Sequence, residues 1–122
     1  MSVQVELEKL LEVAAGFGTV PMLLTADGDG RPRAAAVSVE WELAGDGARA
    51  RVRAGRKSVR NAADRPLASL LWPAPPGERF ALLVDATATA TEPDDDPAAG
   101  GHVTLEVTSA ILHVVARPPR AP

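Results

Sequence analysis

Two neighbouring segments of the sequence alternate between apolar and polar residues, with a turn signal between them. In "RAAAVSVEWEL" (33–43) one set of alternate positions is apolar, and in 48–54 small or apolar residues alternate with Arg49, Arg51 and Arg53. Successive side chains of a β-strand point to opposite faces, so both segments are predicted to be half-buried strands. "AGDG" (44–47) is predicted to be the hairpin turn that joins them.

Four more segments have the composition of strands, being apolar or rich in β-branched residues. They are "TVPMLLT" (19–25), "LASLLW" (67–72), "FALLVDATATAT" (80–91) and "GHVTLEVTSAILHVVA" (101–116). Turn-forming stretches rich in Gly, Asp and Pro separate them. Together with the two alternating segments, the sequence predicts six strands.

Two helices are predicted beside these strands. Between the third and fourth strands, Ser58 can cap a short helix over 58–64, which must end before Pro66. At the N-terminus, Ser2 can cap a helix whose apolar residues recur at three- and four-residue steps, at Val3, Leu7, Leu10, Leu11 and Ala14.

The order of the predicted elements indicates the fold class. Helices and strands do not alternate as they do in a parallel doubly wound sheet. Six antiparallel strands close most naturally into a barrel, which removes exposed strand edges. We therefore expect a mainly β (α+β) fold: a six-stranded antiparallel barrel with an N-terminal helix and a short helix between strands 3 and 4.

Length and composition bound the class of protein. At 122 residues the chain is long enough for one domain and too short for two ordinary ones, so we expect a single domain over 1–122. The absence of cysteine excludes disulfide scaffolds and thiolate chemistry. The N-terminal stretch has no signal-peptide pattern, and no run approaches the roughly 20 apolar residues of a membrane-spanning helix. We expect a cytoplasmic protein that does not contact a membrane.

The positive charge is concentrated in one stretch. The formal net charge of −3 argues against a general nucleic-acid binder, yet "RARVRAGRKSVRNAADRP" (49–66) holds seven of the 13 Lys and Arg residues. Within it, Arg56, Lys57 and Ser58 follow a glycine at the predicted strand-to-helix turn. A helix start favours anions, and cationic side chains add charge-assisted hydrogen bonds, so these three residues are predicted to hold a phosphate. For the strand arginines, a solvated face and an anion site both stay open.

These segments resemble the pyridoxamine 5'-phosphate oxidase-like, FMN-binding split-barrel proteins. The resemblance spans about 17–115 and is carried by "GRPRAAAVSVEW" (30–41) and "ARARVRAGRKSVRNAADRPLASLLW" (48–72). After its third strand that family typically reads glycine, Ser, Arg, Lys, two residues, an amide, and then a run to Pro and a strand. Gly55, Asn61 and Pro66 keep this relative spacing. The resemblance implies a split β-barrel.

The resemblance also implies how the phosphate of FMN is held. Aligned without gaps, the family's Arg-Lys pair falls on Lys57 and Ser58, and a one-residue shift places it on Arg56 and Lys57. Arg53 and Asn61, on either side of this motif, are predicted to be further cofactor-binding residues.

The family's second strand lies along the flavin ring. Its counterpart here includes Ala36, Val37 and Ser38, where small side chains would let a flat ring approach the backbone. The alternative is that the alanines simply pack in a small barrel. Glu40 stands where the pyridoxamine phosphate oxidases proper carry a lysine, so we do not expect vitamin B6 oxidation.

Two functions from different classes follow. The resemblance implies an FMN-dependent oxidoreductase with a small-molecule substrate, a homodimer whose cofactor groove lies between subunits. The family also includes binders of the deazaflavin F420 and of haem, so F420 is the alternative cofactor. The other function is a non-catalytic barrel in which the strand arginines bind an anionic ligand or a partner. No metal site is predicted, because His102 and His113 fall on opposite faces of one predicted strand.

Overall fold

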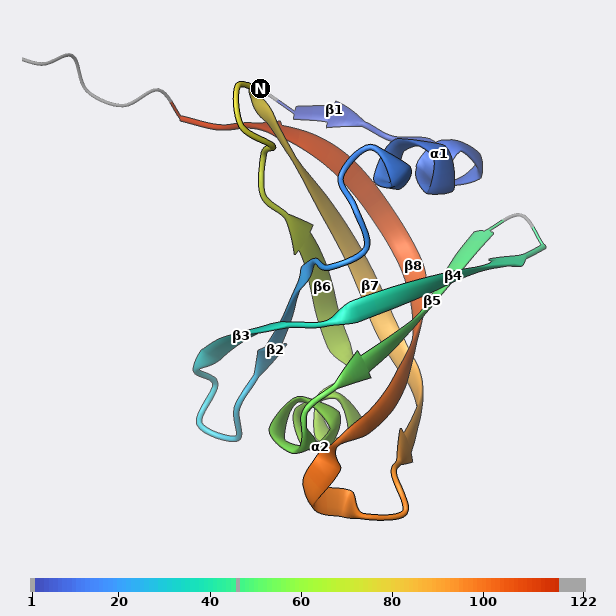
Figure 1. The fold of residues 1–122 in the computed structure, drawn as a ribbon, viewed down its shortest axis with the longest axis vertical. Coiled ribbons are helices and arrows are strands. Elements are labelled where there is room, and N and C mark those ends of the chain that lie inside the picture. Colours follow the sequence, from blue (N-terminus) through green and yellow to red (C-terminus); the bar gives the residue numbers. More distant parts are fainter. Residues whose placement is uncertain (1, 46, 117–122) are drawn as a thin grey trace, which may run out of the picture.

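The computed structural model describes residues 2–45 and 47–116, apart from the side chains of residues 43 and 44 (Figure 1). Its strands are β1 (Ser2–Gln4), β2 (Met22–Ala26), β3 (Pro32–Ala36), β4 (Ser38–Ala44), β5 (Gly47–Ala54), β6 (Leu67–Trp72), β7 (Phe80–Pro93) and β8 (Gly101–Val114). Its helices are α1 (Leu10–Ala15), α2 (Arg56–Asp64) and the short 3-10 helices η1 (Leu7–Lys9) and η2 (Pro97–Ala99). No helix in this part of the chain combines the length and the apolar character needed to cross a bilayer.

The strands form one curled antiparallel sheet in the order β3-β2-β6-β7-β8-β5-β4, and β1 pairs with β8 beside this path. The two ends of that order, β3 and β4, follow each other in the chain with only Val37 between them. The sheet therefore curls back on itself, and α2 lies at the opposite end of the barrel from β1 and α1 (Figure 1). The predicted mainly β split barrel is confirmed.

All six predicted strands are present, but the segment 33–43 is divided. Its first part, β3, pairs with β2, whereas its second part, β4, pairs with β5. The side chain of Val37 at the division is buried in the core. The prediction of one continuous strand was wrong here. The side chains keep alternating through Val37, so the pattern does not show that the strand changes its pairing partner from β2 to β5 at that point.

The predicted N-terminal helix is present only in its second half. Residues 2–4 form β1, which pairs with Ile111–His113 of β8, so Ser2 caps no helix. Residues 2–4 form a strand because β8 is long: it spans Gly101–Val114, but β5 pairs only with its residues 101–106. β1 pairs with backbone groups further along β8 that would otherwise form an open edge. Leu10 and Ala14 are buried, as the helical spacing predicted.

The core lies inside the curl of the sheet. Alternate residues of β5 are buried, as the pattern predicted, and the arginines between them face outward. Trp72 at the end of β6 is 1% exposed, and its Nε1 donates a hydrogen bond to the carbonyl of Gly18 at 2.9 Å. Its ring stacks on Trp41 with 5.9 Å between centroids. The inside of the barrel is thus filled by packed side chains.

Candidate functional site

α2 begins where β5 ends and carries most of the predicted phosphate residues. Gly55 is its N-cap, with extended backbone, and its carbonyl accepts the first helical hydrogen bond from the N–H of Val59 at 3.0 Å. The helix therefore begins at Arg56, two residues earlier than predicted. The prediction that Ser58 caps it was wrong, because glycine can occupy an N-cap without a side-chain hydrogen bond. Val59 and Ala62 are buried against the barrel.

A cleft of about 450 Å³ lies between α2 and the turn that joins β2 to β3. The cationic side chains that line it are Arg56, Lys57, Arg60 and Arg65, and the carboxylates are Asp27, Asp29 and Asp64. Two of the three residues predicted to hold a phosphate, Arg56 and Lys57, are thus brought together at one cleft. The half-exposed Ser58 is not among its lining residues.

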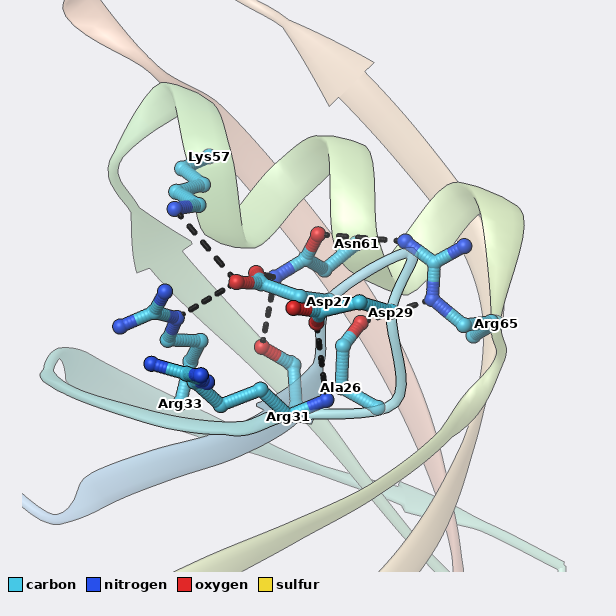
Figure 2. Close-up of polar contacts among 9 residues, drawn as sticks. Ala26, Asp27, Asp29, Arg31, Arg33, Lys57, Asn61 and Arg65 are labelled. Atoms are coloured by element: carbon cyan, nitrogen blue, oxygen red, sulfur yellow. Dashed lines mark hydrogen bonds and ion pairs between the residues drawn. The ribbon is translucent and has the colours of Figure 1, made fainter.

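Asp27, directly after β2, is the centre of the polar contacts between the two walls of the cleft (Figure 2). Its Oδ2 accepts a hydrogen bond from Arg33 Nε at 2.6 Å, and its Oδ1 accepts one from Asn61 Nδ2 at 3.0 Å. Lys57 Nζ lies 3.6 Å from Oδ2. These hydrogen bonds, that of Arg33 first, lower the pKa of the Asp27 carboxyl from 3.8 to about 2. Asp27 is therefore a charged group at neutral pH.

Asn61 fixes α2 to β2 rather than pointing into open space. It is 4% exposed, and its Nδ2 donates to Thr25 Oγ1 at 3.3 Å as well as to Asp27. Its Oδ1 accepts from Arg65 Nη2 at 3.3 Å, and Arg65 Nε donates to the carbonyl of Ala26 at 2.8 Å (Figure 2). Both polar ends of Asn61 are bonded within the protein, so its observed contacts are structural ones.

Arg56 and Arg60 differ from the other cations of the cleft. They lie one turn apart on the exposed side of α2, and neither forms an ion pair or a side-chain hydrogen bond within residues 2–45 and 47–116. Lys57 has Asp27 beside it, but its own side chain is 68% exposed. These three groups are the cations that an anion entering the cleft would meet.

The outward arginines of β5 are paired with acids instead. Arg49 Nε donates to Glu106 Oε1 at 2.6 Å, and Arg51 Nη2 donates to Glu92 Oε2 at 3.3 Å. Arg53 donates two hydrogen bonds to Asp94, at 2.5 and 3.4 Å. Arg53 does not line the cleft. Of the two interpretations left open by the sequence, this geometry favours a solvated, ion-paired face.

The residues predicted to lie along a flavin ring are at the bend between β3 and β4. Ala36 and Ser38 are exposed, whereas the side chain of Val37 is 3% exposed and its N–H donates to the carbonyl of Pro21 at 3.0 Å. Ser38 pairs with Arg53, three residues before α2 begins. The small exposed side chains of Ala36 and Ser38 therefore form a strip that ends near the junction of β5 and α2.

No pattern in the sequence pointed to a role for Asp27, Arg33 or Arg60 in the site. Arg56 lies outside the helix predicted over 58–64, so only the observed start of α2 at Arg56 puts Arg56 and Arg60 at i, i+4 on one helix face. No local signal exists for Asp27 either, because its partner Asn61 is 34 residues away in the chain.

Comparison with known proteins adds the fold to this picture. No family model and no curated protein matches the sequence. Among solved structures, an F420 reductase superposes with a TM-score of 0.61 at 16% identity, over 75% of this chain and 88% of that one. An FMN-binding protein from Syntrophomonas wolfei subsp. wolfei gives 0.67 at 14% identity, over 91% and 88%. A candidate pyridoxamine 5'-phosphate oxidase from Listeria innocua gives 0.57 at 18%, over 86% and 95%.

At these identities the likeness is one of fold. The chain has the split-barrel fold of these FMN-binding, F420 reductase and pyridoxamine 5'-phosphate oxidase-like structures, as the resemblance of its motifs predicted.

Proposed function

We propose that the chain binds FMN at the junction of β5 and α2 and acts as an oxidoreductase on a small-molecule substrate. The phosphate would lie in the cleft against Arg56, Lys57 and Arg60, and the ring would lie against Ala36 and Ser38. The observation that carries the proposal is the cleft itself. There Arg56 and Arg60, which have no acid partner among the residues that the structure describes, adjoin Lys57.

The residues present fit a phosphate-bearing flavin. Arg56 and Lys57 are the first two residues of a nine-residue helix, where backbone N–H groups also favour an anion. The exposed positions 36 and 38 carry no bulky side chain that would exclude a flat ring. Arg53 is engaged with Asp94, so we assign the phosphate to the α2 cations rather than to β5. A bound flavin would supply hydride or electron transfer, and the chain would bind and orient it.

F420 is the alternative cofactor. The F420 reductase is similar over 75% of this chain, and the FMN-binding protein is similar over 91%. We place FMN first because Gly55, Asn61 and Pro66 keep the spacing that is typical of the FMN-binding split-barrel proteins.

We also propose a homodimer with the cofactor groove between subunits. One row of outward side chains crosses five strands in register and is apolar throughout: Ala36, Met22, Leu71, Leu83 and Ile111. These side chains are exposed or only partly buried. A second copy covering this row would remove apolar surface from water and would border Ala36. Sedimentation equilibrium should give about twice the 12.7 kDa chain mass. A monomer mass measured with saturating cofactor would contradict the dimer.

The proposal is tested by cofactor retention. Purified protein is mixed with FMN, and separately with F420, passed through a gel-filtration column, and its visible spectrum is recorded. We expect a flavin band in the unaltered protein and in the control variant Arg49→Ala/Arg51→Ala, which removes two paired cations of β5. The band should be lost in Arg56→Ala/Lys57→Ala, which removes the same charge from the cleft. Retention of neither cofactor by the unaltered protein would refute the proposed function.

The alternative of an arginine face that binds an anionic ligand or a partner has less support. Each outward arginine of β5 has a carboxylate partner from β7, β8 or the turn after β7. An external anion would have to displace these carboxylates one by one.

A further inference from the structure

The cleft already contains an anion that is part of the chain. Asp27 Oδ2 lies 3.6 Å from the ammonium of Lys57, and the Asp27 side chain is only 13% exposed. Hydrogen bonds from Arg33 and Asn61 hold both carboxylate oxygens. Asn61 is itself buried and bonded to Thr25, so the carboxylate cannot turn away from the cleft without breaking the contact between α2 and β2.

This fixed carboxylate opposes any anion that uses Lys57. A phosphate oxygen bonded to the ammonium at roughly 2.8 Å would lie within about 6.5 Å of Asp27 Oδ2. That separation is below the Debye length of about 8 Å at physiological salt, so the repulsion is only partly screened. Lys57 meanwhile must share its charge between the ligand and Asp27.

The other two carboxylates of the cleft are placed differently. Asp29 Oδ1 accepts a hydrogen bond from the backbone N–H of Arg31 at 3.0 Å, within its own turn. Asp64 is exposed at the last position of α2, seven residues after Lys57. Among the described residues, Asp27 alone of the three lies within ion-pair distance of a cation of the cleft.

We propose that Asp27 is a built-in competitor for Lys57 that lowers the affinity of this cleft for phosphate. The inference deepens the proposed function, since it takes the same cleft as the phosphate site. Its consequence is selectivity against bare inorganic phosphate. A phosphate ester gains affinity from the rest of its structure, for which the 450 Å³ cleft and the strip at Ala36 and Ser38 offer surface, whereas a free phosphate has only the cations.

The test measures inorganic phosphate binding by amide chemical-shift titration at constant ionic strength and about pH 8. Asp27→Asn removes the charge but keeps an amide oxygen that can accept from Asn61. Asp64→Asn is the matched control, because it removes one charge from the same cleft without touching Lys57. We expect Asp27→Asn to bind phosphate about tenfold more tightly than the unaltered protein, and Asp64→Asn to stay within about twofold. Equal gains in the two variants, or no gain in Asp27→Asn, would overturn the proposal.

A second comparison isolates Lys57. In a Lys57→Ala background, Asp27→Asn should raise phosphate affinity by about threefold or less, because the competition for the ammonium no longer exists and only the partly screened repulsion remains. A tenfold gain that persists there would refute the role of Lys57. Should Asp27→Asn fail to fold, Asp27→Ser, which retains one oxygen acceptor, replaces it in both comparisons.

The outcome can be separated from that of the flavin proposal. Tighter phosphate binding by Asp27→Asn in a protein that retains no FMN would support the competition and refute the flavin site. If FMN is retained and the retention depends on Arg56 and Lys57, while Asp27→Asn does not raise the affinity for phosphate, the flavin site is supported and the competition is refuted.

Discussion

The outer face of β5 and the exposed side of α2 each carry three cations, but those of α2 line the cleft beside the β2–β3 turn and those of β5 do not. On β5 they are Arg49, Arg51 and Arg53, and every one has a carboxylate within 4 Å. On α2 they are Arg56, Lys57 and Arg60, of which only Lys57 has such a partner among the described residues. Two segments with the same number of cations thus offer different surfaces to an anion.

The difference follows from what each element has beside it. A strand inside a sheet has neighbours on both sides at fixed register positions, and Arg49 lies opposite Glu42 on β4 and Glu106 on β8. On the exposed side of a surface helix the nearest side chains are mostly those one turn away on the same helix, and for Arg56 that residue is another arginine. In this chain, the basic residues of the surface helix are therefore more open to an anion than those of the central strand.

Gly100 packs against the junction of β5 and α2, and its substitution should have the largest effect on stability. Its φ is +94°, and a Cβ there would lie 2.1 Å from the carbonyl oxygen of Ala54, at the end of β5. Gly100→Ala is expected to lower the free energy of unfolding by about 3 kcal/mol, since both the clash and the strained φ must be relieved. Urea denaturation measures it. Gly77→Ala, with φ +82° but nothing within 4 Å, should cost about 1 kcal/mol; equal losses would show that the close approach is unimportant.

Substituting one arginine in each region should have the next largest effect, on the affinity for phosphate. Arg60→Ala should weaken inorganic phosphate binding about fivefold, because it removes from the cleft a cation that forms no ion pair within the described part of the chain. Arg51→Ala should change it by less than about twofold, since Arg51 lies on β5 and faces Glu92. Amide chemical-shift titration at constant ionic strength measures both. Equal weakening by the two substitutions would indicate general attraction by the basic stretch instead of a site.

The pH dependence of stability tests the α2 region alone. The Asp27 pKa is about 2 in the folded chain against 3.8 ordinarily, so between these values the unfolded chain binds more protons. The stabilisation by ionised Asp27 is complete above about pH 4 and is lost as the pH falls through 2. The difference in unfolding free energy between the unaltered protein and Asp27→Asn should shrink over that range in urea denaturation. A difference that stays constant would contradict the ionised network.

The ion pairs of β5 should have the smallest effect. Arg51 and Glu92 are both partly exposed, with 34% and 61% of their side chains accessible. A double-mutant cycle with Arg51→Ala and Glu92→Ala should give a coupling of about 0.5 kcal/mol or less in unfolding free energy. A coupling above about 1.5 kcal/mol would mean that the face is a structural network rather than a solvated surface.

Sequence patterns predicted an element well where its structure depends on its own residues alone. β6 has the predicted bounds 67–72, and the inward and outward residues of β5 follow the alternation. The division at Val37 and the pairing of β1 with β8 depend on which strand lies alongside, which alternation does not encode. The site follows the same rule: the cleft cations Arg56 and Lys57 were predicted from a local turn, whereas Asp27 and the acid partners of β5 come from distant segments.

Amide chemical-shift mapping with FMN tests the central claim most directly, because it shows where the ligand binds as well as whether it binds. We predict that the largest shifts fall on Gly55 to Asn61 and on Ala36 to Ser38, while the amides of Arg49 to Val52 change little. Shifts concentrated on the outer face of β5, or no saturable shifts at all, would contradict the assignment of the cleft beside α2 as the phosphate site.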